Sequence, residues 1–254
     1  MFVKSMSRIA AIALAAALSI SSVHAAESDV PASQRQQIKA AVERNTDGKV
    51  TVNEVYRTPI PGFFEATSGL DVFYVDASGR YALVEGHLMD LKSKQDLTQA
   101  RMEKVQGIDF SALPLNLAIK TVQGTGRRAI AVFEDPTCPV CKVLHKFIAQ
   151  LPDVTVYTFV FPIVSPESMP ISRAAWCSPN RAVAWEQAMS GNPRPGNGGN
   201  CDTSAINQVL ALGEKLQVVG TPTVFLGNGR RLVGATPPDQ FIQALNEVAP
   251  PSSN

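Results

Sequence analysis

The fold of this chain is decided by one stretch, Ala129-Ile130-Ala131-Val132-Phe133-Glu134-Asp135-Pro136-Thr137-Cys138-Pro139-Val140-Cys141. The apolar run at its start predicts a strand that is buried on both faces of a sheet. The stretch also opens a run of apolar side chains at helical spacing: Val140, Val143, Leu144, Phe147, Ile148 and Leu151. A strand, a CxxC motif and a helix in this order are the setting in which a dithiol exchanges with other disulfides.

The two cysteines of the motif are expected to have different roles. Pro139 suits the first turn of a helix, where its missing N–H costs nothing. Cys138 would then lie at the helix N-terminus, where unpaired N–H groups and the helix dipole favour a thiolate. Cys141 lies nearly one turn further on the same face and should be more buried. We therefore expect Cys138 to attack and Cys141 to resolve the mixed disulfide.

Two other functions are possible for a CxxC motif. It can form half of a zinc site, but the chain has no second CxxC and its three histidines are not spaced as partners. It can also be a structural bridge, but so short a loop constrains the unfolded chain little. The strand and helix around the motif favour redox chemistry.

A second motif is Gly220-Thr221-Pro222-Thr223-Val224, in which Pro222 lies 81 residues after Cys141. Pro222 could simply be the first residue of an apolar strand. The alternative is a cis-proline that holds its neighbour's backbone against the dithiol. A hairpin signal at residues 227–229 and a terminal helix follow, and this context favours the cis-proline.

The first residues predict export. Lys4 and Arg8 precede an apolar run at residues 9–20, which is too short for a bilayer span, and cleavage is expected after Ala25. An uncleaved membrane anchor is the alternative. The short, Ala-rich signal favours a bacterial periplasm, where the four cysteines can form disulfides. The formal net charge of +1, without a basic block, does not suggest nucleic-acid binding.

The mature chain is expected to form two domains. Residues 26–89 contain a helix at 31–44 and about four short strands in an antiparallel meander, a core so small that pairing with a second copy would help it. Residues 90–107 are polar and rich in helix formers, which predicts a connecting helix; a surface helix of one larger domain is the alternative. Residues 108–254 predict a strand–helix–strand unit, further helices within 167–216, a hairpin and a last helix.

Several segments resemble the periplasmic thiol–disulfide isomerases of the DsbC/DsbG family. The residues that carry this resemblance are Asp135 to His145, Ala175-Trp176-Cys177, Asn200-Cys201-Asp202 and Gly220-Thr221-Pro222. The resemblance implies an α+β, cystatin-like N-terminal dimerisation domain, a linker helix, and an α/β thioredoxin-fold domain with a helical insertion at about 165–217. It also implies a V-shaped homodimer with two active sites that face a shared cleft.

The resemblance assigns roles to six residues. Cys138 and Cys141 would be catalytic, and Thr221 with cis-Pro222 would bind the substrate backbone. Cys177 and Cys201 would pair in a structural disulfide, whose loop of about 25 residues would add roughly 3.5 kcal/mol of stability. A second redox pair is the alternative for these two cysteines.

Three positions near the motif bear on the reactivity of the dithiol. Thioredoxin carries a buried acid six residues before its first cysteine, where this chain has Val132, so no base at that position would assist Cys141. Glu134 is expected to be structural or solvated. His145 could modulate the thiolate, although a solvated histidine on a helix is the favoured interpretation.

The sequence thus predicts a periplasmic disulfide isomerase that needs no cofactor or metal beyond its own dithiol. Its expected partners are misoxidised exported proteins and a DsbD-like membrane reductase that keeps Cys138 and Cys141 reduced. Two alternatives stay open: a DsbG-like reductase of sulfenylated single cysteines, and a holdase chaperone. The Pro139-Val140 dipeptide would set the redox potential.

Overall fold

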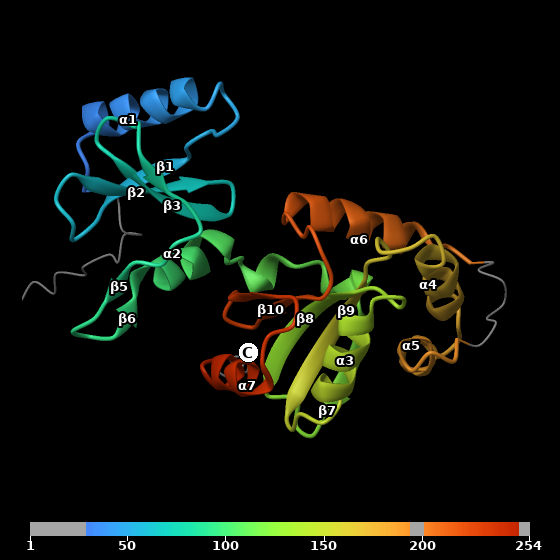
Figure 1. Cartoon of the computed structure of the whole chain (residues 1–254). Helices are drawn as coiled ribbons and strands as arrows, with labels where there is room; N and C mark the ends of the chain where they lie inside the picture. Colours follow the sequence, from blue (N-terminus) through green and yellow to red (C-terminus); the bar gives the residue numbers. More distant parts are fainter. Residues whose placement is uncertain (1–28, 194–200, 249–254) are drawn as a thin grey trace, which may run out of the picture.

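The computed structural model describes residues 29–193 and 201–248, and it has two folded parts that helix α2 (Leu97–Gln106) connects (Figure 1). The expected signal segment at residues 1–25 lies outside the described residues, as do residues 194–200 of the loop before Cys201. None of the described helices is long and apolar enough to cross a membrane.

The N-terminal part is one helix packed on a four-stranded antiparallel meander. Its elements are α1 (Ala32–Asn45), β1 (Glu54–Arg57), β2 (Phe63–Ser68), β3 (Asp71–Asp76) and β4 (Ala82–Leu83), with the strands in sequence order. Helix α1 buries Ile38 and Val42 against Phe64 and Phe73 of the sheet. The expected meander is therefore confirmed, and its core is small.

Helix α2 covers the other side of this sheet. The hydroxyl of the buried Tyr74 is hydrogen-bonded to that of Thr98, and Arg101 forms an ion pair with the buried carboxylate of Glu65. Strand side chains alternate between the two faces, so neighbouring residues Phe73 and Tyr74 contact α1 and α2 respectively.

The connecting helix is shorter than predicted. Residues 89–96 form a hairpin of β5 (Met89–Asp90) and β6 (Gln95–Asp96), and α2 begins only at Leu97. The Asp90 carboxylate accepts hydrogen bonds from the Lys92 and Ser93 backbone N–H groups and so closes a turn. Asp96 accepts from Gln99 N and caps the helix. Local side-chain bonds thus replaced the helix that the composition suggested.

The C-terminal part is built on a five-stranded sheet in the order β11-β10-β8-β9-β7. Its strands are β7 (Ile119–Gln123), β8 (Arg128–Glu134), β9 (Val154–Val160), β10 (Thr223–Leu226) and β11 (Arg231–Val233). Strands β8 and β9 are parallel and joined by α3 (Pro139–Ile148), which is the expected strand–helix–strand unit. A 3₁₀ turn, Leu115–Leu117, precedes β7.

Strand β8 is buried on both faces. Ile130 and Val132 belong to a cluster with α3 and α7 (Pro238–Asn246), whereas Ala131 and Phe133 belong to one that includes α6 (Ser204–Lys215). The Phe133 ring stacks on that of Phe159 with 4.9 Å between the centroids. An uninterrupted apolar strand is what a sheet covered on two sides requires.

Two further helices complete the helical insertion, α4 (Ser168–Trp176) and α5 (Arg181–Met189). Helices α4 and α5 pack together and α5 lies beside α3 and β7, whereas α6 packs on the opposite face of the sheet (Figure 1). A third buried cluster includes Cys138, Cys141, Trp176 and Trp185. The insertion therefore builds the apolar surroundings of the CxxC motif.

The linker helix is fastened to the C-terminal part by Arg231. Its guanidinium donates to the carbonyls of Gln106, Leu216 and Gln217, which lie at the C-terminal ends of α2 and α6. A cation is favoured at these helix ends because the unpaired carbonyls carry partial negative charge.

Replacing Phe159 by Ala should lower the free energy of unfolding by about 3–5 kcal/mol, because it leaves a cavity beside Phe133 in a fully buried part of the core. Urea denaturation monitored by circular dichroism measures this. The control is Val233→Ala, which removes a half-exposed apolar side chain from the same domain. It should change the free energy of unfolding by less than about 0.5 kcal/mol. Equal effects of the two substitutions would contradict this account of the core.

Candidate active site

Cys138 occupies the N-cap of α3. Its sulfur accepts a hydrogen bond from the Cys141 N–H at 3.4 Å, and its thiol faces the carbonyl oxygen of Thr221 at 3.4 Å. Both cysteines are free thiols in this structure. Cys138 keeps 6% of its surface exposed, whereas Cys141 has 0%. Cys141 is therefore more buried than Cys138, as the spacing of the motif predicted.

The Thr221–Pro222 peptide bond is cis, as the sequence predicted. It lies immediately before β10, which pairs with β8 on one side and with β11 on the other. Since β8 leads into the CxxC motif, this pairing brings the backbone of Thr221 against Cys138 although 83 residues separate them. The sheet is thus what unites the two motifs.

The carboxylate of Asp135 fixes the turn between β8 and Cys138. One oxygen, Oδ1, accepts from the backbone and hydroxyl of Thr137 and from the hydroxyl of Ser168. The other, Oδ2, accepts from the backbone N–H groups of Ile163 and Val164. Asp135 is fully buried, so these bonds replace its hydration. Sequence reasoning did not assign it this function, although an Asp two residues before a Thr is a known turn signal.

Cys141 is held as a thiol by its surroundings. Burial is the largest effect and raises its pKa, and the negative charge of Glu134 acts in the same direction. The backbone N–H of Asp135 donates to the sulfur and partly offsets this rise.

A buried charged cluster lies behind the dithiol. His145 Nδ1 is 3.2 Å from Glu134 Oε2, and its Nε2 is 2.8 Å from Glu186 Oε2. Trp185 Nε1 donates to the same Glu134 oxygen at 3.0 Å. Glu134 is 1% exposed and the His145 side chain 17%. Glu134 was expected to be structural or solvated, and His145 to be solvated. Neither residue is solvated, because α5 of the insertion covers both.

The pKa of His145 is raised to about 9. Burial alone would lower it, but the bonds and charges of Glu134 and then Glu186 outweigh that effect. At neutral pH His145 is therefore an imidazolium between two carboxylates.

Cys177 and Cys201 are joined by a disulfide, which links the end of α4 to the residues that precede α6. The two Cα atoms are 5.6 Å apart. Among the residues that the structure describes, no group of three His, Cys, Asp or Glu side chains is arranged to hold a metal ion.

His145 should stabilise the fold in a pH-dependent way. Its folded pKa of about 9 exceeds the unfolded value, so its contribution is complete below about pH 6.5 and is lost as pH rises through 9. The difference in unfolding free energy between the native chain and His145→Gln should be about 3 kcal/mol larger at pH 6 than at pH 10. Denaturant titrations of both proteins at pH 6 and pH 10 measure this difference in unfolding free energy. A difference that is the same at the two pH values would contradict the ion pairs of His145.

Comparison with known families supports these observations. Residues 115–249 match the model of the thioredoxin-like domain, and residues 21–99 match the N-terminal domain of disulfide bond isomerase proteins. A solved disulfide interchange protein from Neisseria gonorrhoeae is 37% identical, with a TM-score of 0.50; the match covers 54% of this chain and 98% of that one.

Named relatives are similar over most of their length. The probable thiol:disulfide interchange protein DsbC of Bordetella pertussis is 40% identical over 211 residues, which are 83% of this chain and 74% of the relative. The thiol:disulfide interchange protein DsbC of Escherichia coli K12 is 24% identical over 77% of this chain and 81% of its own. The chain belongs to the DsbC family of thiol:disulfide interchange proteins.

Proposed function

We propose that the protein rearranges and reduces wrong disulfides in exported proteins, with Cys138 as the attacking thiol. The observation that carries this proposal is the position of Cys138, at the N-terminus of α3 and against the backbone of Thr221. The Cys138 thiolate attacks a substrate disulfide, and one substrate sulfur leaves as a thiolate. A second substrate thiol then displaces Cys138, which gives isomerisation, or Cys141 does so, which gives reduction.

The surface around Cys138 suits an unfolded polypeptide. Five apolar side chains on three segments near the motif are at least one third exposed: Val140, Val143, Ile163, Val164 and Val219. Ile163 and Val164 are tied to the active-site turn through Asp135, and Val219 precedes Thr221 by two residues. We propose that this apolar rim receives apolar side chains of the client, while Thr221 and Pro222 bind its backbone.

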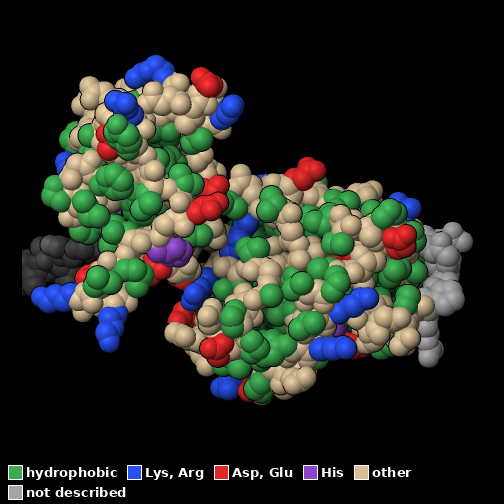
Figure 2. Space-filling view, viewed as in Figure 1, with side chains coloured by type: hydrophobic (Ala, Val, Ile, Leu, Met, Phe, Trp, Pro, Cys, Tyr) green, Lys and Arg blue, Asp and Glu red, His purple; other side chains and the backbone are tan. Residues whose placement is uncertain are grey.

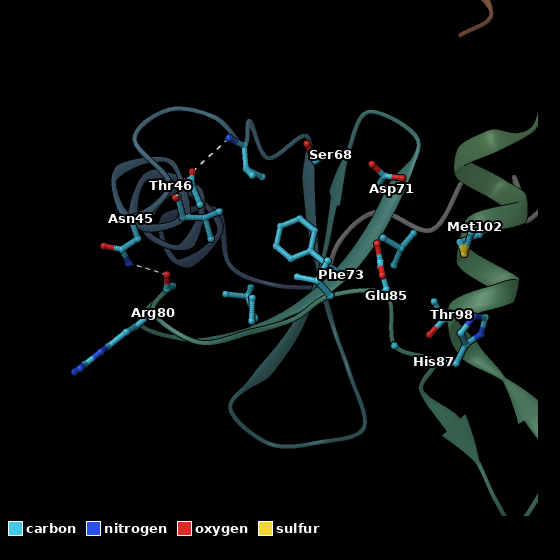
Figure 3. Close-up of a pocket in the computed structure, with 18 residues that line it drawn as sticks. Asn45, Thr46, Ser68, Asp71, Phe73, Arg80, Glu85, His87, Thr98 and Met102 are labelled. Carbon is cyan, nitrogen blue, oxygen red and sulfur yellow. Dashed lines mark hydrogen bonds between the residues drawn. The ribbon is translucent and has the colours of Figure 1, made fainter. Parts of the chain in front are cut away.

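We further propose a homodimer formed by the N-terminal domains. A cavity of about 550 Å³ opens among α1, β3, α2 and the segment after β4, and its lining includes Val42, Phe73, Val84 and Met102 (Figure 3). Strand β4 pairs with β3 on one side only, and Leu83 and Val84 are more than half exposed beside it. Apolar side chains gather over this domain (Figure 2). A second copy would cover both the edge and the cavity.

The same chemistry supports an oxidising compartment, and the family resemblance adds a reductant. Isomerisation needs a reduced Cys138, and the Cys177–Cys201 disulfide needs an oxidising compartment. We therefore place the protein in the periplasm, after cleavage behind Ala25, with a DsbD-like membrane reductase as its partner.

Replacing Cys141 by Ala should trap clients as mixed disulfides with Cys138, because the resolving thiol is missing. Non-reducing electrophoresis and mass spectrometry of the trapped species identify the clients. Clients with several disulfides support isomerase function, whereas clients with a single cysteine support the reductase alternative.

The matched control is Cys138→Ala, which should trap nothing and should not rearrange scrambled ribonuclease. If isomerisation survived in this variant, Cys138 would not be the attacking thiol, and a holdase function would gain support.

A charge at the β4 edge should separate the dimer. Val84→Asp introduces a carboxylate into the apolar surface, and analytical ultracentrifugation should give the mass of one chain instead of two. Val122→Asp places the same charge at a half-exposed position of the C-terminal domain and should leave the dimer intact. A native chain that sediments as a monomer would refute the proposed assembly.

A further inference from the structure

The loop of residues 217–222, which we call the client loop, connects the end of α6 to the start of β10 (Figure 1). It contains Thr221 and Pro222, the two residues proposed to bind the client backbone. Its position decides how far the Thr221 carbonyl oxygen lies from the Cys138 sulfur, a distance of 3.4 Å in this structure. No helix or strand includes these six residues, so bonds from neighbouring elements must hold them in place.

Three hydrogen bonds to carbonyl oxygens hold the client loop. The donors are the guanidinium of Arg231 to Gln217 at 3.1 Å, the hydroxyl of Thr223 to Gly220 at 2.8 Å, and the N–H of Gly234 to Pro222 at 2.9 Å. The first and the last of these donors belong to β11 and to the residue that follows it. The strand that pairs with β10 therefore holds the client loop at both of its ends.

Arg231 is the charged one among the three donors, and it is 9% exposed. Within the described ranges 29–193 and 201–248, no acidic side chain forms an ion pair with it. Its guanidinium binds carbonyl oxygens instead, at the C-terminal ends of α2 and α6. A buried charge without a counter-ion is costly, and an apolar side chain would fill the same space without that cost. Packing alone therefore does not account for an arginine at this position.

The first residue of the client loop benefits from such a donor. Gln217 has a φ of 52°, in the left-handed region that glycine favours, and it is exposed. The chain turns here, and the Val218 N–H bonds back to the carbonyl of Gly213 and closes the end of α6. Because Arg231 binds the carbonyl of Gln217 itself, it holds the turn that leads the chain from α6 toward Cys138.

The same guanidinium joins the client loop to the linker helix. Its Nε donates to the carbonyl of Gln106, the last residue of α2, at 3.1 Å. The side-chain amide of Gln106 donates in turn to the carbonyl of Leu70, in the turn between β2 and β3, at 3.2 Å. A continuous set of hydrogen bonds thus runs from the N-terminal domain through Arg231 to the client loop.

We propose that Arg231 is a positioning residue for client binding: its guanidinium holds the client loop where Thr221 and Pro222 can pair with the client backbone beside Cys138. The planar fork of an arginine is needed, because the three carbonyls belong to the ends of two helices. The inference rests on the proposed function of the client loop. Loss of the fork should weaken client binding and leave the reactivity of Cys138 toward a small disulfide unchanged.

Arg231→Met keeps an unbranched side chain and removes every donor. In the rearrangement of scrambled ribonuclease, KM should rise at least tenfold and kcat should stay within twofold, because the client loop binds the client equally in the ground state and the transition state. The reaction of Cys138 with 5,5′-dithiobis(2-nitrobenzoate), a disulfide without a peptide backbone, should keep its rate constant within twofold. A smaller rise in KM overturns the proposal, and so does a parallel loss of the small-disulfide rate.

Arg231→Lys tests the fork separately from the charge. One ammonium nitrogen cannot replace three guanidinium nitrogens that bind the ends of two helices. KM for scrambled ribonuclease should therefore rise at least threefold in this variant. A smaller rise would mean that a positive charge alone suffices, and it would overturn the proposal.

The matched control is Arg230→Met. Arg230 also fastens α2, through ion pairs with Glu103 at 2.8 Å and with Glu247 after α7 at 3.0 Å, but both partners lie outside the client loop. This variant should leave KM within twofold of the native value. An equal rise of KM in Arg230→Met and Arg231→Met would overturn the proposal, because attachment of the linker helix would then decide client binding.

If neither Arg231 variant folds, Thr223→Val decides. It removes the hydroxyl that holds Gly220 and keeps the size of the side chain, so KM should rise at least threefold with kcat within twofold. An unchanged KM overturns the proposal. A native chain that does not rearrange scrambled ribonuclease refutes the proposed function itself, whereas a native chain that does so with the KM of Arg231→Met refutes only the role of Arg231.

Discussion

Five hydrogen bonds to the buried carboxylate of Asp135 hold the active-site region together. They connect the turn before Cys138, the segment after β9 and the start of α4. An unpaired buried carboxylate would be costly, so each donor must stay in place for the fold to be stable. One carboxylate therefore sets the turn before α3 and the Ile163 and Val164 part of the apolar rim.

The same end of the sheet makes the two cysteines unequal. Cys138 lies at a helix N-terminus beside a cis-proline, with a little of its surface exposed. Cys141 lies one turn deeper, within an apolar cluster to which the helical insertion contributes two tryptophans. The insertion also covers Glu134 and His145, and the carboxylates of Glu134 and Glu186 beside His145 raise its pKa despite its burial. The insertion thus matters to the chemistry as well as to packing.

The N-terminal domain by itself leaves apolar surface uncovered. Its sheet is covered by α1 on one face and partly by α2 on the other, which leaves an edge strand of two residues and an open apolar cavity. A domain of this size buries little surface by itself, so a partner surface is energetically valuable. Arg231 fastens α2 to the C-terminal domain, so the N-terminal domain and the dithiol are connected through a short helix that is anchored at its C-terminal end.

The sequence by itself determined the buried strand, the helix that opens at Cys138 and the meander, because each has a local signal: an uninterrupted apolar run, Pro139 at a helix start, and alternation between turns. It also favoured the cis-proline, because Thr-Pro stands before a strand, a hairpin and a terminal helix. It did not determine where α2 starts, since the side chains of Asp90 and Asp96 decide between a turn and a helix. It also left Glu134 and His145 without a function. Only the tertiary structure brings Trp185 against Glu134 and Glu186 against His145, although both lie about 40 residues beyond His145 in the chain. The burial of a charge depends on what packs over it, and its sequence neighbours do not reveal this.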